Sequence, residues 1–372
     1  MRLRYLVIVF PACASAASAQ ALRDAGSIAR DLATTASRDV SAANEIVAPS
    51  AQRAVEPTIV TDGLMIGAVN VEGASSLPRE VFAPAISDYL GKQASMQDLQ
   101  GLAKAVASVA RDRGYVFATA IIPPQTIDAG MVTVRIDDGD IALVRVTGSR
   151  STRLQRTLDL IVGRGVRREV LERQLLLAGD IPGIEIVTTR LMHEDIGNVL
   201  VVEVRESRGN GFAGLDNYGS RELGPVRARL RYDFIGLADD SDVLSVQVVA
   251  TPVDPRQLAY LSVRYAASLG TGGTQVAVTG ALGRAQPSNS GVKSTSSFVS
   301  VSVSTPLKRA NDVSIWANAE LGVLRVDGTS NGVPDQRDSM AVATGWLYAT
   351  ARTGRGRLSG ALGLAQIGRA HV

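Results

Sequence analysis

The sequence predicts an α+β protein with two copies of a small β-α-α-β-β domain, followed by an incomplete antiparallel transmembrane β-barrel. The first observation is a repeat: VNVEG at residues 69–73 recurs as VRVTG at residues 144–148, and two helical segments follow each copy. The second is that the helical period disappears after Arg208, where alternating strands begin. The third is composition, because 36 glycines and 4% aromatic residues favour many short strands over a large aromatic core.

Residues 1–19 are predicted to be a secretory signal peptide. Two arginines precede an apolar core at residues 6–10, and an A-x-A cleavage site stands at residues 17–19. The only cysteine, Cys13, would be removed with the signal, so no disulfide or thiol chemistry would remain. A lipoprotein anchor on Cys13 is the alternative, although the residues before it make a poor lipobox.

The next two segments precede the first domain. Residues 20–37 are predicted to form a helix with a modest apolar stripe. Residues 38–62 are rich in Ala, Ser, Pro and single charges, which is typical of a linker. No run of about 18 apolar residues follows, so any membrane span would have to be made of strands.

The first repeat is expected to span residues 63–139. After its first strand come a helix at residues 79–90 and a second helix at residues 95–113, which begins with a capping-box pattern at Ser95. Pro84 lies inside the first helix. It should either kink that helix or move its start later, and the sequence leaves both possibilities open.

The end of the first repeat has the most distinctive sequence pattern in the chain. Gly114 can end the second helix, and residues 115–122 then run extended with β-branched and aromatic side chains. Pro123 and Pro124 stop this strand because neither can donate to a sheet. Residues 131–137 alternate apolar and polar side chains, which predicts a second strand with one buried face.

The second repeat is expected to span residues 140–207. Asp138-Gly139, just before it, is also a strong hairpin signature that would pair residues 131–137 with residues 140–146. That hairpin would leave the second repeat without its first strand, so a joint between two domains is expected instead. The predicted elements are a strand at residues 144–148, helices at 151–162 and 167–178, and strands at 184–191 and 199–204.

Residues 208–365 are predicted to be the N-terminal part of the barrel. In residues 226–234, apolar side chains alternate with Arg227, Arg229 and Arg231, the apolar-out and polar-in pattern of a membrane barrel. A soluble sandwich could also bury an apolar face, but a row of arginines is hard to bury in a dry core. Nine strands are expected, near residues 211–218, 224–235, 242–251, 257–269, 273–283, 297–306, 312–325, 338–351 and 355–364.

The predicted strands carry two further expectations. The connections at residues 285–296 and 326–337 should be long, and they are extracellular if the first strand runs outward. Nine strands do not close a single-chain bacterial barrel, which uses an even number. The segment QIGRAHV at residues 366–372 reads like non-native sequencing-adapter sequence joined to a broken reading frame. We therefore expect the native chain to continue beyond about Ala365 with further strands.

Two places in the chain resemble a known family. GY at residues 114–115, PPQ at residues 123–125 and Gly130 resemble the end of the first POTRA domain in the two-partner secretion transporters. These outer-membrane proteins export filamentous haemolysins and adhesins. The segment LDNYG at residues 215–219 also resembles the first barrel strand of that family.

The resemblance implies a fold, a location and partners. Residues 63–139 would be POTRA 1 and residues 140–207 POTRA 2, both in the periplasm, and residues 20–37 would be a plug helix inside a sixteen-stranded barrel in the outer membrane. The POTRA pair would capture an unfolded exoprotein, and the barrel would pass it outward. Outer-membrane lipid and the barrel assembly machinery are the other implied partners. The alternatives are a POTRA-barrel assembly factor and, in another class, a secreted all-β adhesin.

Two sets of residues are candidates for function. An extended substrate could add a strand to the edge next to the helix at residues 97–111, although Tyr115, Phe117 and Ile121 could equally be mainly core. The second set would line the pore, guiding a polar chain or holding the plug helix. The candidate substrate-binding residues are Tyr115, Phe117, Thr119, Ile121 and Gln125, and the candidate pore-lining residues are Arg227, Arg229, Arg231 and Arg264.

Several other functions find little support. A net charge of +3 with scattered Lys and Arg argues against a nucleic-acid partner. The G-x-G-x-x-G match at residues 209–214 precedes a strand, whereas a dinucleotide site needs a helix there. Asp239, Asp240 and Asp242 fit a solvated turn better than a calcium loop, and His193 has no metal-ligand neighbours. With no nucleophile-base pair in view, we expect no enzyme activity, cofactor or metal.

Overall fold

The structure is a computed structural model of the 372-residue chain. It describes residues 64–73, 77–125, 129–288, 290–354 and 356–369. The predicted signal peptide at residues 1–19, helix at 20–37 and linker at 38–62 lie outside the described residues, as do residues 370–372 of the predicted tail. The chain divides into two compact units, and each is described by itself. One contains Glu45–Ala178 and Glu185–Arg205, and the other contains Gly179–Ile184 and Glu206–Val372.

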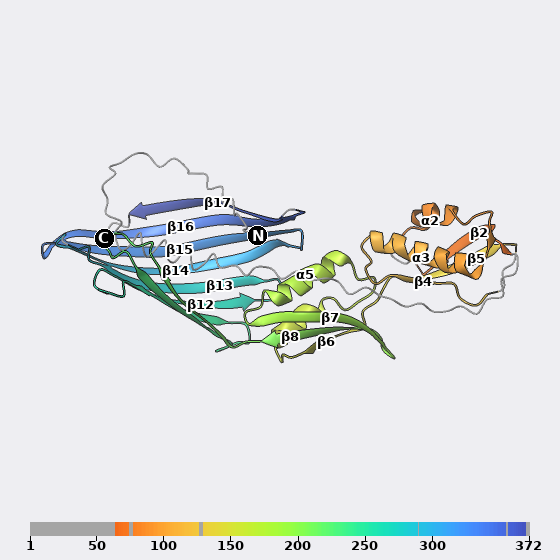
Figure 1. The fold of residues 1–372 in the computed structure, drawn as a ribbon, viewed down its shortest axis with the longest axis horizontal. Helices are drawn as coiled ribbons and strands as arrows, with labels where there is room; N and C mark the ends of the chain where they lie inside the picture. Colours follow the sequence, from red (N-terminus) through yellow and green to blue (C-terminus); the bar gives the residue numbers. More distant parts are fainter. Residues whose placement is uncertain (1–63, 74–76, 126–128, 289, 355, 370–372) are drawn as a thin grey trace. The chain divides into compact units, whose positions relative to one another are not determined.

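The first repeat has the predicted β-α-α-β-β order. Its elements are β1 (Leu64–Met65), β2 (Ala68–Glu72), η1 (Arg79–Phe82), α2 (Ala83–Ser87), β3 (Gln93–Ala94), α3 (Met96–Asp112), β4 (Thr119–Ile121) and β5 (Met131–Asp137). In the main sheet, β5 lies between β2, which is parallel to it, and β4, which is antiparallel (Figure 1). The helices and sheet share one core, which includes Phe82, Leu99, Leu102, Val106, Val132 and Val134.

The position of Pro84 is now resolved. A 3₁₀ turn precedes α2, and Pro84 lies in the first turn of α2, where its missing N–H has no helical partner to lose. The helix therefore starts later than residue 79 and is not kinked. It also ends at Ser87, earlier than the sequence predicted.

The second repeat has the same order. Its elements are β6 (Leu143–Thr147), α4 (Thr152–Asp159), α5 (Arg168–Gly179), β7 (Ile184–Glu194) and β8 (Gly197–Glu206), with the sheet order β6-β8-β7. The repeated glycines have a shared cause. Gly73 and Gly148 follow the first strand of their repeats with φ of +88° and +92°, and a Cβ at either position would collide with a backbone carbonyl, that of Ile136 or Val204.

The joint at Asp138-Gly139 is confirmed, since β5 pairs with β2 and β4 while β6 pairs with β8. Main-chain contacts from the second repeat reach the first at this joint. The amide of Arg168 donates to the carbonyl of Gly114 at 2.7 Å, and Tyr115 and Arg167 form an isolated antiparallel bridge. The two repeats are thus held together by main-chain contacts as well as by the covalent connection at Asp138-Gly139.

The rest of the chain forms one antiparallel sheet in which nine strands follow one another in sequence order (Figure 1). They are β9 (Gly209–Asp216), β10 (Arg227–Ile235), β11 (Val243–Ala250), β12 (Leu258–Leu269), β13 (Thr274–Ala285), β14 (Val292–Arg309), β15 (Val313–Ser330), β16 (Val333–Thr353) and β17 (Gly356–Arg369). The predicted number of strands is confirmed. Within residues 209–369, as far as the structure describes them, the sheet does not close on itself, because β9 and β17 each have one strand neighbour.

The expectation of two long connections is wrong. β14 already begins at Val292, and β15 and β16 are joined by a turn at Asn331 and Gly332 alone. Both turn residues have positive φ, 48° and 85°, as a two-residue hairpin of type I′ requires. The polar residues of 326–337 on either side of this turn belong to β15 and β16. They were expected to form a loop because they are polar, but a strand can continue with polar side chains beyond its apolar section. At the other end of the sheet, β17 also extends past residue 364, and Gln366 pairs with Ala343.

None of the helices in the described part of the chain is long and apolar enough to cross a membrane.

Candidate functional site

The helix beside the candidate strand edge is fixed at both ends. At its start, Ser95 caps α3: the amide of Asp98 donates to the Ser95 hydroxyl at 3.2 Å, and the amide of Ser95 donates to the Asp98 carboxylate at 2.9 Å. The Ser95 hydroxyl also donates to this carboxylate, and these bonds lower the pKa of Asp98. At its end, Gly114 takes a left-handed φ of +98° and turns the chain toward β4.

The first two candidate substrate-binding residues are core residues. Tyr115 is 7% exposed and Phe117 is 1% exposed. Tyr115 also belongs to the joint with the second repeat, because the guanidinium of Arg167 lies 5.7 Å from the centre of its ring. These two buried side chains therefore fix the position of the segment that leads into β4, and they are not available to contact a substrate.

The exposed part of the edge is short. β4 has three residues and, among the strands that the structure describes, pairs with β5 alone, so its other side is a free edge of this sheet. Thr119 is half-buried, and the side chain of Ile121 is 37% exposed. Arg111 of α3 donates to the carbonyl of Ala118 at 2.9 Å, which ties the helix to the start of this strand.

Gln125 lies where the prolines have ended β4. Its side-chain NH₂ donates to the carbonyl of Thr133 and its side-chain oxygen accepts from the amide of Thr133, both at 2.8 Å. The amide group of Gln125 thus makes the pair of hydrogen bonds with β5 that a neighbouring strand residue would make. β5 keeps its main-chain partners beyond the point that β4 reaches.

The nine-stranded sheet has two different faces. In β10, Leu230, Tyr232 and Phe234 are exposed, whereas the alternating arginines are half-buried on the other face. The same alternation continues across the sheet. We call the first surface the apolar face, which includes Leu230, Tyr232, Phe234, Leu261, Val263, Val278, Val299, Val301 and Leu321, and the second the polar face, which includes Arg229, Arg231, Gln247, Ser262, Arg264, Thr279, Ser300 and Glu320.

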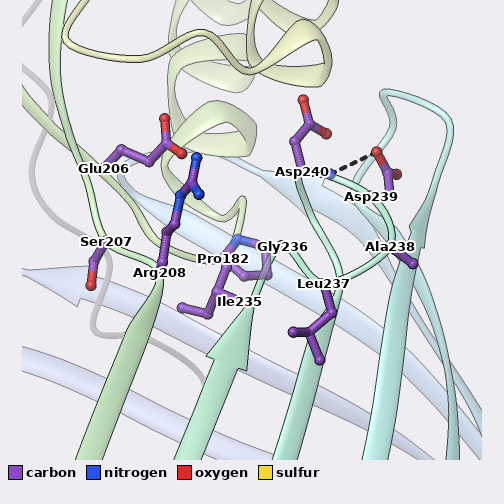
Figure 2. A pocket seen from close by; sticks show the side chains of 10 residues that line it. All are labelled: Pro182, Glu206, Ser207, Arg208, Ile235, Gly236, Leu237, Ala238, Asp239 and Asp240. Atoms are coloured by element: carbon purple, nitrogen blue, oxygen red, sulfur yellow. Dashed lines mark hydrogen bonds between the residues drawn. The ribbon is translucent and has the colours of Figure 1, made fainter.

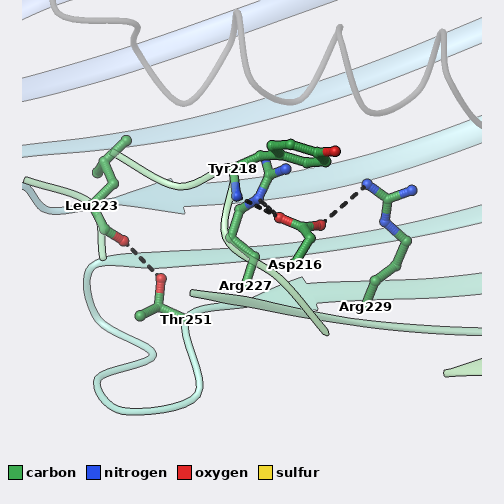
Figure 3. A network of polar contacts seen from close by, with 6 residues as sticks. All are labelled: Asp216, Tyr218, Leu223, Arg227, Arg229 and Thr251. Carbon is green, nitrogen blue, oxygen red and sulfur yellow. Dashed lines mark hydrogen bonds and ion pairs between the residues drawn. The ribbon is translucent and has the colours of Figure 1, made fainter. Parts of the chain in front are cut away.

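All four arginines predicted to line a pore lie on the polar face, and three of them have acidic partners. Asp216 of β9 contacts Arg227 at 2.8 Å and Arg229 at 4.0 Å, and it accepts the amide of Tyr218 at 3.0 Å (Figure 3). Arg231 pairs with Asp233 on its own strand at 3.0 Å. Sequence reasoning missed Asp216 as a partner, because the pairing depends on the register between β9 and β10.

The polar face also carries a row of polar side chains that crosses six strands, from β10 to β15. In the strand register, Ser245 is opposite Asp233 on one side and Arg264 on the other. Arg264 is opposite Thr279, which is opposite Ser300. The row ends on a further acid that the sequence analysis did not single out, since Ser300 donates to Glu320 at 2.7 Å. The sequence could have identified Glu320 as a residue of the polar face, because it alternates with the apolar Leu321 in a predicted strand.

The three aspartates of the β10–β11 turn form a structural turn. The carboxylate of Asp242 is buried and accepts from the amide of Leu237 at 2.7 Å, the amide of Ala238 at 2.8 Å and the phenol of Tyr265 at 2.6 Å. Burial opposes its ionisation, but these hydrogen bonds outweigh burial and lower the pKa of Asp242. Asp242 is therefore the cap of the turn.

The outer side of this turn borders an open pocket of about 230 Å³. Figure 2 shows Glu206, Arg208, Asp239 and Asp240 around it. Within the described residues, no group of three or more His, Cys, Asp or Glu side chains could hold a metal ion. His193 lies 3.2 Å from the side-chain oxygen of Asn198 and is exposed.

Comparisons with known proteins agree with this architecture. The family model of the POTRA domain, ShlB-type, matches residues 64–139. Over 150 residues the chain is 25% identical to the heme/hemopexin transporter protein HuxB of Haemophilus influenzae, a match that covers 38% of this chain and 26% of HuxB. This chain thus matches about a quarter of the length of that curated relative.

Two solved structures have the same fold. CdiB from Escherichia coli superposes with a TM-score of 0.64 at 16% identity, over 91% of this chain and 66% of that one. CdiB from Acinetobacter baumannii gives a TM-score of 0.54 at 11% identity, over 91% and 69%. The chain therefore contains a POTRA domain of the ShlB type, and its fold is that of a POTRA protein with a large antiparallel sheet.

Proposed function

We propose that this protein is the outer-membrane transporter of a two-partner secretion pair. It receives an unfolded exoprotein in the periplasm through its POTRA repeats and passes it across the outer membrane. The observation that carries this proposal is the combination, in one chain, of a ShlB-type POTRA domain with an antiparallel sheet that has one apolar and one polar face. An apolar face suits lipid, and a polar face suits a water-filled lumen.

The cargo is an unfolded polypeptide. The free edge of β4 offers main-chain donors and acceptors, and any extended chain can pair with them regardless of its sequence. HuxB is named as a transporter for heme/hemopexin, but we draw only the transport class from that similarity. The sequence of the exoprotein would be selected by side-chain contacts next to the edge.

The five candidate residues have different parts in this scheme. Thr119 and Ile121 on β4 contact the substrate, because they lie at the free edge and Ile121 is exposed. Tyr115 and Phe117 hold the edge in place from the core. Gln125 is hydrogen-bonded to the main-chain groups of Thr133, the part of β5 that extends beyond β4. The substrate therefore pairs with β4 and not with β5.

The polar face lines the route through the membrane. Arg229, Arg231 and Arg264 lie there with acids nearby, so a passing chain meets charges of both signs and binds to none for long. Residues 20–37 act as the plug of this route in the resting state. Lipid and the barrel assembly machinery are partners, and the protein has no enzymatic role.

Secretion in a reconstituted host tests the proposal. The protein is expressed in a bacterial host together with a large exoprotein of the two-partner secretion type, and the exoprotein is measured in the medium. Export that depends on the transporter is expected. Equal export without the transporter would contradict the function.

A pair of substitutions at one position tests the edge. The main-chain groups of Thr119 face β5, whereas those of Ala120 face the free edge, because the two residues alternate along the strand. Ala120→Pro removes this free main-chain donor and adds bulk at the edge, and we expect it to abolish export. Ala120→Ser keeps the amide and is the matched control, which should export normally. Normal export by a folded Ala120→Pro protein would rule out pairing at β4 while leaving the transporter function in place.

A further inference from the structure

One ion pair in the unit that contains the nine-stranded sheet differs from the others in its burial and geometry. Arg309 ends β14, and Asp180 lies in Gly179–Ile184, the segment between α5 and β7 that belongs to this unit. Nε and Nη2 of Arg309 donate to the two carboxylate oxygens of Asp180, both at 2.7 Å. The third nitrogen, Nη1, donates to Ser314 at 3.0 Å. All three guanidinium nitrogens are therefore bonded.

A β-bulge brings Arg309 to this position. Pro306 pairs with Trp316 and Lys308 with Ile315, which leaves Leu307 as an extra residue in β14. Before the bulge, odd-numbered residues such as Val299 lie on the apolar face, so unbroken alternation would put Arg309 there too. With the extra residue, Arg309 pairs with buried Ser314 and is itself only 4% exposed.

The surroundings of Arg309 make the contact specific for arginine. Its guanidinium lies 5.2 Å from the centre of the Trp316 ring. The side chain is 2% exposed, whereas Arg190 in its pair with Glu203 is 67% exposed. An exposed pair contributes little to stability, but a buried arginine that loses its partner is strongly disfavoured.

A second contact holds the same segment. The carbonyl of Gly183 accepts the amide of Ser207 at 2.8 Å. A Cβ at Gly183, where φ is +77°, would also lie 3.2 Å from Ile235 of β10. The segment is therefore fixed to the sheet unit near both of its ends.

We propose that Arg309 and Asp180 are positioning residues that anchor Gly179–Ile184 to the end of the sheet. The chain leaves this unit for β7 and returns from β8 next to that anchored segment. The anchor is independent of the proposed function, which enters only through the export measurement below.

Hydrogen exchange of the full-length protein in lipid nanodiscs tests the anchor. In Asp180→Asn, exchange of the backbone amides in residues 179–184 should accelerate at least about tenfold, because the buried guanidinium has lost its charged partner. Arg309→Lys should do the same, since lysine cannot make the planar fork. Lys308→Met removes a neighbouring exposed charge and is the matched control, which should leave the exchange unchanged.

Two results would overturn the anchor: unchanged exchange in Asp180→Asn, or an Arg309→Lys protein that behaves like the wild type. Asp180→Asn lies outside the strands, so it remains informative if substitutions at Arg309 prevent assembly. Export is measured in parallel on Asp180→Asn protein that is folded in the membrane. Reduced export is expected, and normal export despite accelerated exchange would show that the segment needs no fixed position for transport.

Discussion

The side-chain amide of Gln125 is hydrogen-bonded to the backbone of Thr133 through both its oxygen and its nitrogen, each at 2.8 Å. This contact continues the hydrogen-bonding pattern between β4 and β5 past the point where the two preceding prolines end β4. Pro123 and Pro124 end β4 after Ile121, and the next position along β5 would otherwise expose an unpaired main-chain N–H and C=O. One side chain thereby sets how far the free edge of the domain extends.

Gln125→Ala should weaken the first repeat. Two hydrogen bonds are lost and the main-chain groups of Thr133 lose their partner, which should reduce the local free energy of opening by about 1–3 kcal/mol. Hydrogen exchange of the β5 amides measures this. Gln97→Ala on the exposed side of α3 is the control and should change little. Equal protection of β5 in both variants would contradict the role of Gln125.

Asp242→Asn should destabilise the β10–β11 turn. The asparagine keeps the size of the side chain but loses a charged acceptor of two backbone amides and the Tyr265 phenol, which should cost about 2–3 kcal/mol. The urea midpoint of the folded protein in detergent measures the loss. Tyr265→Phe removes the phenol alone and should cost less than Asp242→Asn. The reverse order would show that the amides contribute little.

The contribution of Asp242 should depend on pH in a defined direction. Its pKa is lowered in the folded protein, so its stabilising effect is fully present above the ordinary aspartate pKa of about 3.9. The effect is lost as the pH falls below that value and through the folded pKa. The difference in urea midpoint between the wild type and Asp242→Asn should therefore be constant near neutral pH and narrow below about pH 4. A difference that grows in acid would contradict the assignment.

Arg264→Gln should change the ion selectivity of the pore. Arg264 lies on the polar face near Arg231, Glu320 and Asp233, so removing its charge leaves the lumen more negative. Planar-bilayer recordings should show a shift of the reversal potential toward cation preference. Arg325→Gln is the matched control, because Arg325 is exposed and follows the apolar residues of β15. The same shift in both variants would contradict a lumenal position for Arg264.

Patterns that repeat within the chain could be predicted from the sequence. Gly73 and Gly148 mark the same position in two domains, and the alternation around Arg229 identified the sheet with its two faces. The sequence also predicted the cap at Ser95, because Ser95 and Asp98 are close in the chain. In each case the physical cause acts within a few residues or recurs at a fixed period.

Features that depend on long-range register could not be predicted. The side-chain contact of Gln125 needs Thr133 beside it, and that of Arg309 needs Asp180, 129 residues away. Counting alternate residues also fails after Leu307, because one inserted residue reverses the two faces. The Asn331-Gly332 turn was missed for a different reason: its strong hairpin signal lies in a polar segment that resembled a loop.

Site-specific cross-linking during export tests directly whether the exoprotein binds at the free edge of β4. A photoreactive residue is placed at Ile121, on the free edge of β4, or at Met131, which is also apolar and is 53% exposed but lies on β5. We expect a cross-link between the transporter and the exoprotein from position 121 and none from position 131. No cross-link from position 121 during active export, or equal cross-linking from both positions, would contradict capture of the substrate at this edge.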